Sequence, residues 1–146
     1  MEDSRAFFTL VDRLVDARPL TAASTARLVG RPLQPASDAS TERTLIYVAR
    51  DAPEFERVEL RLAGPKSSND DQLLILELNA SRCLRLDDVR RHFGPHPEPG
   101  VPSAHQPSEA PTFFRYPLAW GTLAFGFARS GEGCLKSVVL DVATAK

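Results

Sequence analysis

Apolar residues recur at helical spacing near the start of the chain. They are Phe7, Leu10, Val11, Leu14 and Val15. Side chains three and four residues apart share one face of a helix, so this pattern predicts an amphipathic helix over residues 4–17. Ser4 is available to cap the start of this helix, and Pro19 closes the segment.

A second, shorter helix is predicted to begin after Thr21, whose hydroxyl can accept a hydrogen bond from the first turn. Small apolar residues follow at helical spacing as far as Val29. Gly30 then supplies the left-handed conformation that ends many helices. The small side chains on the apolar side of this helix allow it to pack closely against a neighbour.

Three strand-like runs follow a polar loop that contains proline and serine. The runs are TLIYVAR (44–50), FERVELRLAG (55–64) and QLLILELNA (72–80). In the middle run, Val58 and Leu60 alternate with the charged Glu59, which is the period of a sheet with one buried face and one face in water. Polar turns connect the runs, so the pattern predicts a three-stranded antiparallel meander.

The same order of elements then begins again. A helix is predicted over residues 84–93 and ended by Gly94, and a proline-rich loop follows it. Three more strand-like runs come next: TFFRYPLAW (112–120), GTLAFGFAR (121–129) and CLKSVVLDVA (134–143). We therefore expect one α+β domain over residues 1–146, with an antiparallel sheet packed against helices. It would be built as two helix-plus-three-strand repeats over 20–80 and 84–143.

Duplication would solve a burial problem, because a lone helix on a three-stranded meander has a small core and exposed sheet edges. In an alignment that matches Gly30 with Gly94, Tyr47 corresponds roughly to Tyr116 after a longer loop. Few residues are identical in this alignment, so the prediction rests on the order of elements. The alternative is that the helix-then-meander order, which is common in α+β proteins, recurs by coincidence.

Composition narrows the class of protein. The 146 residues include 18 basic and 19 acidic side chains, so the net charge of −1 lacks the basic excess of proteins that neutralise phosphates. The first residues are acidic where a secretory signal needs Lys or Arg, and no apolar run reaches the length of a membrane span. We expect a soluble, cytoplasmic monomer or homodimer with no nucleic-acid and no membrane partner.

The sequence does not indicate a catalytic or metal site. Cys83, His92 and His96 carry suitable metal ligands, but a Gly-Pro pair breaks the helix between the two histidines. The neighbouring Asp87 and Asp88 point about 100° apart on a helix and suit its acidic first turn. We therefore expect no cofactor, no metal and no enzymatic activity.

The two cysteines, Cys83 and Cys134, could pair in an oxidising compartment. Because a cytoplasmic location is expected, buried free thiols are the preferred interpretation.

Aromatic residues gather in the second set of strands. Phe125 and Phe127 share a parity on their predicted strand and are expected in the core. Phe114 and Tyr116 share a parity on another strand, and Trp120 lies just before a turn, where a ring is hard to bury. Surface rings are good interface anchors because they bring large contact area at low entropy cost. We predict that Phe114, Tyr116 and Trp120 bind a partner; the alternative is that they only fill the core.

The proline-rich loop over residues 94–111 is a second candidate for partner contact. Proline pre-sets backbone angles, which reduces the entropy lost when a loop is fixed against a partner. His105 and Glu109 lie in this loop, and Asp70 and Asp71 lie in the turn between the second and third strands. We predict that these residues bind a partner, the acids being suited to a basic cleft; a plain connecting loop is the alternative.

The segments VRRHFG, FFRYPLAW and GTLAFGFARSGEGCLKSVVLDV follow one another in the second predicted repeat. This order of a helix ending at a Phe-Gly turn, an aromatic strand and a hydrophobic hairpin resembles the repeat of β-lactamase inhibitory protein and the related small outer-membrane lipoproteins. The resemblance covers residues 84–142, and more weakly 20–80. It implies a small tandem scaffold whose sheet face and loops grip another protein. The chain has no lipidation signal and no N-terminal cysteine, so the envelope-assembly role of the lipoproteins is not expected to carry over.

These features together favour a protein that binds another protein. We hypothesise an immunity or inhibitor protein that occludes the active site of a cognate bacterial toxin, such as an effector of a type VI or contact-dependent secretion system. A cytoplasmic secretion chaperone for an effector is the alternative, and a small enzyme of unfamiliar type is a third hypothesis. A chaperone would leave the toxin active, a deep polar cleft would favour an enzyme, and a flat aromatic face would favour binding.

Overall fold

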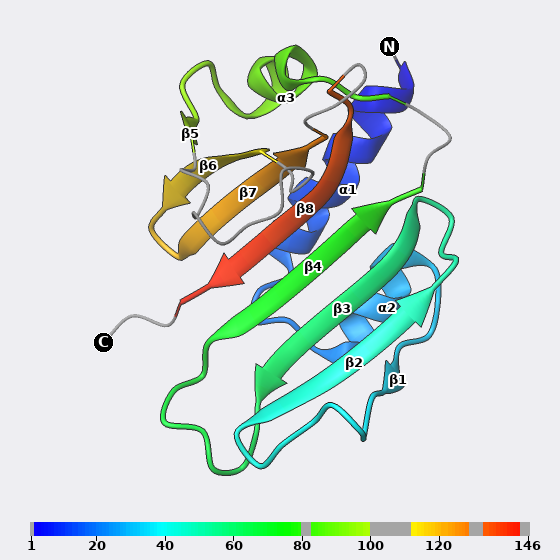
Figure 1. The fold of residues 1–146 in the computed structure, drawn as a ribbon, viewed down its shortest axis with the longest axis vertical. Helices are drawn as coiled ribbons and strands as arrows, with labels where there is room; N and C mark the ends of the chain where they lie inside the picture. The colour runs from blue at the N-terminus through cyan, green and yellow to red at the C-terminus, as the bar shows by residue number, and fades with distance from the viewer. Residues whose placement is uncertain (1, 80–82, 100–111, 129–132, 144–146) are drawn as a thin grey trace.

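The chain forms one antiparallel sheet with its helices on one side (Figure 1). The computed structural model describes residues 2–79, 83–99, 112–128 and 133–143. The helices are α1 (Glu2–Asp16), α2 (Ala22–Val29) and α3 (Leu86–Phe93). The strands are β1 (Gln34–Pro35), β2 (Thr44–Arg50), β3 (Phe55–Ala63), β4 (Gln72–Leu78), β5 (Glu98–Pro99), β6 (Thr112–Leu118), β7 (Gly121–Phe127) and β8 (Leu135–Val142). The predicted α+β class, with an antiparallel sheet against helices, is confirmed.

The sheet joins two meanders through their last strands. Its strand order is β1-β2-β3-β4-β8-β7-β6-β5, and every neighbouring pair is antiparallel. Between β4 and β8, Ile75 lies opposite Val139 and Leu74 lies opposite Leu140. Because β4 and β8 would each be an edge strand in a lone meander, their pairing removes two open edges at once.

Both outer edges of the described sheet end in a two-residue strand that contains proline, Pro35 in β1 and Pro99 in β5. Proline has no N–H to donate, so it blunts an edge against further strands. Along β2, the carbonyl of Ile46 accepts a hydrogen bond from Ala36 N at 2.7 Å, and Ile46 N donates to Ser40 Oγ at 2.9 Å. These outward backbone groups of β2 are therefore already satisfied within the chain.

The helix ends follow local chemistry. Thr21 caps α2, its hydroxyl accepting a hydrogen bond from Ser24 N at 2.9 Å, and Gly30 ends α2 with a positive φ of 79°, as predicted. Helix α3 begins at Leu86, later than the predicted residue 84, because Arg85 is extended and the carbonyl of Leu84 accepts a hydrogen bond from Leu135 N at 2.7 Å. None of the described helices is long and apolar enough to cross a membrane.

The core lies between the sheet and the helices, and its centre is aromatic. Phe8 of α1 lies 5.5 Å from Phe93 of α3 between ring centroids, and Phe93 lies 5.0 Å from Phe125 of β7. Phe7 packs against Phe55 of β3 at 5.8 Å. Aromatic side chains bury large areas, so these contacts fasten both α1 and α3 to the sheet.

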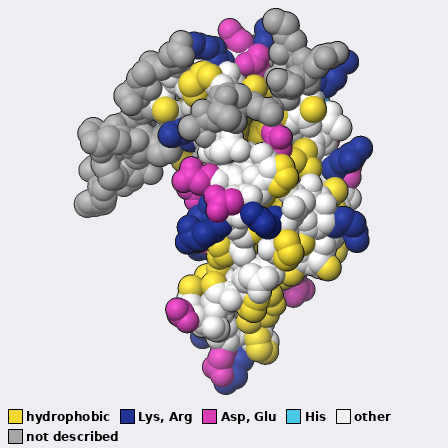
Figure 2. All heavy atoms as spheres, turned by 90° about the vertical axis from the view of Figure 1, so that its right-hand side faces the viewer, with side chains coloured by type: hydrophobic (Ala, Val, Ile, Leu, Met, Phe, Trp, Pro, Cys, Tyr) yellow, Lys and Arg dark blue, Asp and Glu magenta, His cyan; other side chains and the backbone are white. Residues whose placement is uncertain are grey.

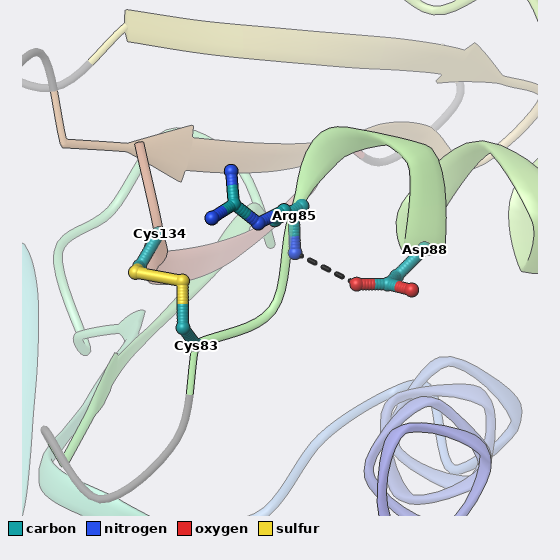
Figure 3. Close-up of a disulfide and its surroundings, with 4 residues drawn as sticks. All are labelled: Cys83, Arg85, Asp88 and Cys134. Carbon is teal, nitrogen blue, oxygen red and sulfur yellow. Dashed lines mark hydrogen bonds between the residues drawn. A yellow bond between two sulfur atoms is a disulfide. The ribbon is translucent and has the colours of Figure 1, made fainter. Parts of the chain in front are cut away.

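Cys83 and Cys134 form a disulfide, so the prediction of free thiols is wrong (Figure 3). Their Cα atoms lie 4.9 Å apart, within the span that a disulfide bridges. The residues are 51 positions apart in sequence, and they meet because the extended segment before α3 runs beside the start of β8. That proximity depends on the tertiary fold, which cysteine spacing alone does not reveal.

We expect the double substitution Cys83→Ser and Cys134→Ser to lower the free energy of unfolding by about 3–4 kcal/mol, because the bond restricts a long loop of the unfolded chain. Urea denaturation with and without dithiothreitol measures the effect. The wild-type midpoint should fall in the reductant to that of the double variant, whose own midpoint should not move. A wild-type midpoint indifferent to reductant would contradict the presence of the bond.

Candidate functional site

The face of the sheet opposite the helices is the candidate functional site, and we call it the distal face. Side chains alternate along each strand, and residues directly opposite one another on neighbouring antiparallel strands point to the same face. Val58, Leu60 and Leu74 are fully buried toward the helices. The distal face is formed by the residues between them and by their cross-strand partners, which include Ile46, Val48, Arg50, Arg57, Glu59, Arg61, Leu73, Ile75, Glu77, Phe113, Arg115, Ala124, Val139 and Asp141.

One row of directly opposed residues crosses the middle of this face. From β2 to β6 it reads Val48, Glu59, Ile75, Val139, Ala124 and Arg115. The aliphatic members Val48, Ile75 and Val139 are half-buried. The row is therefore an apolar stripe with a single carboxylate set into it and an arginine at its β6 end.

That carboxylate is held between two arginines of its own strand, and we call Arg57, Glu59 and Arg61 the arginine clamp. Arg57 Nη1 lies 2.7 Å from Glu59 Oε1, and Arg61 Nε lies 2.5 Å from Glu59 Oε2. Residues two apart on a strand point the same way, which brings all three side chains to the distal face. Glu59 is only 6% exposed, so the expectation that this face lies wholly in water is wrong at its centre.

The charge of Glu59 is stabilised by its two partners. Burial by itself raises the pKa of Glu59, but the hydrogen bonds and charges of Arg61 and Arg57 outweigh burial and hold the pKa below its ordinary value of 4.5. Arg57 also lies 3.6 Å from Glu77 on β4. The clamp thus fixes two guanidinium groups in place on the distal face.

A groove of about 630 Å³ runs along the β1–β2 edge, next to the clamp. This edge groove is lined by Arg31, Pro32, Gln34, Pro35, Ala36, Val48, Ala49, Arg50 and Arg57. Figure 2 views this side of the molecule, where Lys and Arg side chains (dark blue) lie near acidic ones (magenta) in the middle, among hydrophobic side chains (yellow). Arg31 is fixed in the groove wall, because its Nε and Nη2 donate to the carbonyls of Arg50 and Asp51 at 3.2 and 3.0 Å.

A second groove of about 440 Å³ lies at the other end of the clamp. Arg61, Arg43 and Leu73 line it, together with the acids Asp71 and Asp141 and the 67–69 turn. Its charge is mixed, whereas the residues lining the edge groove include three arginines and no acid. The two grooves therefore differ in the ligands that they can attract.

Two of the predicted aromatic anchors point toward the helices. Phe114 lies 5.9 Å from Phe127 between ring centroids, and Tyr116 lies 6.0 Å from Phe125, both half-buried against the core. The Tyr116 hydroxyl donates to the carbonyl of Gly94 at 2.7 Å. Burial raises the pKa of Tyr116 although the charge of Arg90 lowers it, which keeps the phenol protonated as a donor.

The remaining predicted contact residues lie apart from the clamp. Trp120 is half-buried, with the Arg18 guanidinium carbon 4.4 Å from its ring centroid. Asp70 and Asp71 are exposed in the β3–β4 turn, and Asp71 also lines the second groove. His105 and Glu109 lie outside the described residues. The partner-binding role of these residues stays a prediction.

Polar side chains near α3 are engaged in structural contacts. Cys83 is held in the disulfide, and His92 Nε2 lies 2.6 Å from Asp12 Oδ2 of α1. Asp88 pairs with Arg91 one turn later in α3. Within the described ranges, no group of three or more His, Cys, Asp or Glu side chains is placed to hold a metal ion.

The arginine clamp is the feature that sequence reasoning missed. Its signal was present, because Arg57, Glu59 and Arg61 occupy alternate positions between buried aliphatic residues. What the alternation could not show is that Val48 and Ile75 flank Glu59 from the neighbouring strands and help to exclude water from it.

Comparison with known proteins finds no matching family model, no matching curated protein and no matching solved structure.

We expect Glu59→Gln to lower the free energy of unfolding by about 1–3 kcal/mol near neutral pH, because it removes the charge that both guanidinium groups pair with. Glu77→Gln is the matched control. Its carboxylate faces Arg57 but is 46% exposed, so the change should stay within about 0.5 kcal/mol. Urea denaturation followed by circular dichroism measures both variants, and equal losses would contradict the special role of Glu59.

The Glu59 effect should depend on pH with a defined sign. Because the folded pKa lies below the unfolded value of 4.5, the stabilisation is present above that value and is lost as pH falls through the folded pKa. The difference between wild type and Glu59→Gln should therefore shrink between about pH 7 and about pH 3. A difference that grew toward low pH would contradict the assigned direction.

A structural role for Tyr116 predicts that Tyr116→Phe lowers the free energy of unfolding by about 1 kcal/mol, because the Gly94 carbonyl loses its donor. Tyr47→Phe is the control. The Tyr47 ring also packs against the core, but its hydroxyl makes no hydrogen bond to a described residue, so its loss should cost less than about 0.5 kcal/mol. Thermal unfolding of both variants distinguishes the two cases.

Proposed function

We propose that this protein binds another protein through its distal face, and that it is an immunity or inhibitor protein that occludes a cognate bacterial toxin. The observation that supports the proposal is the arginine clamp in the apolar stripe. Glu59 is 6% exposed before any partner arrives, so the clamp and the half-buried Ile75 and Val139 offer an ordered surface. Ordered side chains lose little entropy on binding, which favours tight occlusion.

The sheet edges are poorer binding surfaces than the distal face. Strand addition needs unpaired backbone groups along an edge strand. At β2 the backbone N–H and carbonyl of Ile46 are already bonded to Ser40 and Ala36, and β1 ends in Pro35. The proposed interface is therefore made by side chains of the distal face and by the grooves at both ends of the clamp.

We further propose that the two halves are copies of one helix-plus-three-strand unit. Each half contains a helix, a two-residue edge strand and a three-stranded meander in the same order. Pro35 lies opposite Tyr47, and Pro99 lies opposite Phe114. In this register Phe114 is the counterpart of Tyr47. The sequence alignment instead matches Tyr47 with Tyr116, two residues later. Joining two copies through β4 and β8 doubles the width of the distal face.

The predicted contact residues take a revised place in this proposal. The turns that contain Trp120, Asp70 and Asp71 lie at one end of the sheet. At this end Gln72 and Gly121 lie opposite Val142 on either side of β8. There these three residues would contact the rim of a partner. The fixed positive charges of the distal face suit acidic groups of a partner, whereas the exposed acids suit basic ones. Phe114 and Tyr116 would support β6 from the helix side.

The compartment of action also enters the proposal. Disulfides persist mainly in oxidising compartments. The Cys83–Cys134 bond therefore favours neutralisation of a toxin outside the reducing cytoplasm, in place of the cytoplasmic location expected from composition.

The proposal is tested with the product of the neighbouring gene. We expect the two purified proteins to co-elute in gel filtration, and cells that produce the neighbour to survive when this protein is co-produced in the same compartment. Co-elution without loss of toxicity would favour a secretion chaperone. If the proteins do not co-elute and the cells are not protected, the proposal is wrong.

Substitutions locate the interface. The double variant Ile75→Lys and Val139→Lys places two charges in the centre of the distal face, and we expect affinity to fall at least about 100-fold, because the interface would bury unpaired ammonium groups. Ala23→Lys on the exposed side of α2 is the control and should bind like wild type. Circular dichroism checks that both variants are folded. Normal binding by the double variant, with loss of binding in Trp120→Ala, would place the interface at the turn that contains Trp120.

A further inference from the structure

We propose that the edge groove binds an acidic segment of the partner, with a carboxylate seated among Arg31, Arg50 and Arg57 and small apolar side chains against the rest of the groove. This inference rests on the proposed function, because it names the chemistry by which a protein partner engages the distal face. Three arginines line this one groove of about 630 Å³.

The arrangement of two of these arginines is unfavourable for the chain alone. Arg50 and Arg57 lie directly opposite one another on β2 and β3. Like charges in directly opposed positions destabilise a sheet. Arg57 is neutralised by Glu59 and Glu77, but the Arg50 guanidinium makes no hydrogen bond or ion pair with any residue in the described part of the chain. A bound carboxylate would supply the missing negative charge.

Arg31 and Arg57 are already oriented. Arg31 follows the left-handed Gly30 at the end of α2, and its guanidinium is fixed by the successive carbonyls of Arg50 and Asp51. Arg57 is fixed by its 2.7 Å contact with Glu59. A guanidinium has five N–H donors in a planar fork, so each of these arginines keeps donors for a ligand. Fixed donors lose little entropy when a ligand binds.

The fold itself does not require these charges. The second meander has the same register, with Pro117 opposite Thr122 where the first has Arg50 opposite Arg57. Ala124 of β7 occupies the row position that corresponds to Glu59 of β3. Two meanders of the same topology therefore form with and without the charged residues, which points to a ligand as the reason for them.

The walls of the groove favour a peptide over a nucleic acid. Pro32, Pro35, Ala36, Val48 and Ala49 form an apolar lining beside the arginines. Glu59 and Glu77 lie next to Arg57, where they would repel the continuous charge of a phosphate backbone but leave room for an isolated carboxylate. Arginine and carboxylate match in bidentate geometry.

The test measures fluorescence anisotropy of a labelled peptide in which glutamate alternates with alanine and proline, mixed with the full-length protein. The same peptide with glutamine in place of glutamate is the ligand control. We expect saturable binding of the acidic peptide only, and a loss of about tenfold in affinity for Arg50→Ala. Arg13→Ala removes the same charge from the exposed side of α1 and should change affinity less than about twofold. Arg31 is not the residue to replace, because it bonds the backbone.

The other outcomes overturn either the groove assignment or the proposed function, and the two failures can be told apart. Equal binding of both peptides, or an equal loss of affinity in Arg50→Ala and Arg13→Ala, would show that the groove does not recognise a carboxylate. Stronger binding of a labelled single-stranded oligonucleotide, lost in Arg50→Ala, would make the groove a nucleic-acid site. If the peptide does not bind while the toxin partner co-elutes equally with wild type and Arg50→Ala, the inference fails and the proposed function stands. If the peptide binds through Arg50 and no toxin partner is neutralised, the proposed function fails and the groove assignment stands.

Discussion

The pairing of β4 with β8 is the interaction on which the rest of the structure depends. It brings Leu74 opposite Leu140 and Leu76 opposite Val138, so that two meanders share one buried face under the helices. Each meander alone would expose its last strand as an open edge and bury little apolar surface. The same pairing places Ile75 beside Val139 on the distal face, and the two half-faces become one continuous surface there.

The helix side and the distal face of the sheet differ in the interactions that they contain. On the helix side, Phe8, Phe93 and Phe125 form a closely packed aromatic centre that holds α1 and α3 to the sheet. Stability comes from that side, because burial of large apolar side chains is the dominant favourable term in folding. The distal face carries the charged Arg57 and Glu59, and the neighbouring edge groove contains Arg50, whose guanidinium has no partner among the described residues. The disulfide joins the segment before α3 to the residue that precedes β8.

The candidate site was only partly predictable from the sequence. Period-two alternation placed Glu59 and Arg61 on the face opposite the core, which is correct, but also placed them in water, which is wrong for Glu59. Burial of Glu59 depends on Val48 of β2 and Ile75 of β4, which lie directly opposite it on the two neighbouring strands. The sequence analysis predicted partner contacts on β6 because this strand is rich in aromatic residues. The face to which each ring points is decided by strand register. Phe113, whose ring lies close to Gly126, shares the distal face with Arg115, and Phe114 turns toward Phe127.

The sequence by itself determined the helices and the longer strands, because their causes are local: period 3.6 in α1, period two in β3, the hydroxyl of Thr21 and the left-handed Gly30. The two-residue strands β1 and β5 lie in segments predicted to be loops. The sequence also determined the two meanders, since each of their strands pairs with the next strand along the chain across a short connection. Only the tertiary structure decided that β4 pairs with β8, that Cys83 meets Cys134, and that Arg31, Arg50 and Arg57 share one groove. These meetings join residues far apart in the chain, and no local pattern specifies which distant segment completes a strand, a bond or a site.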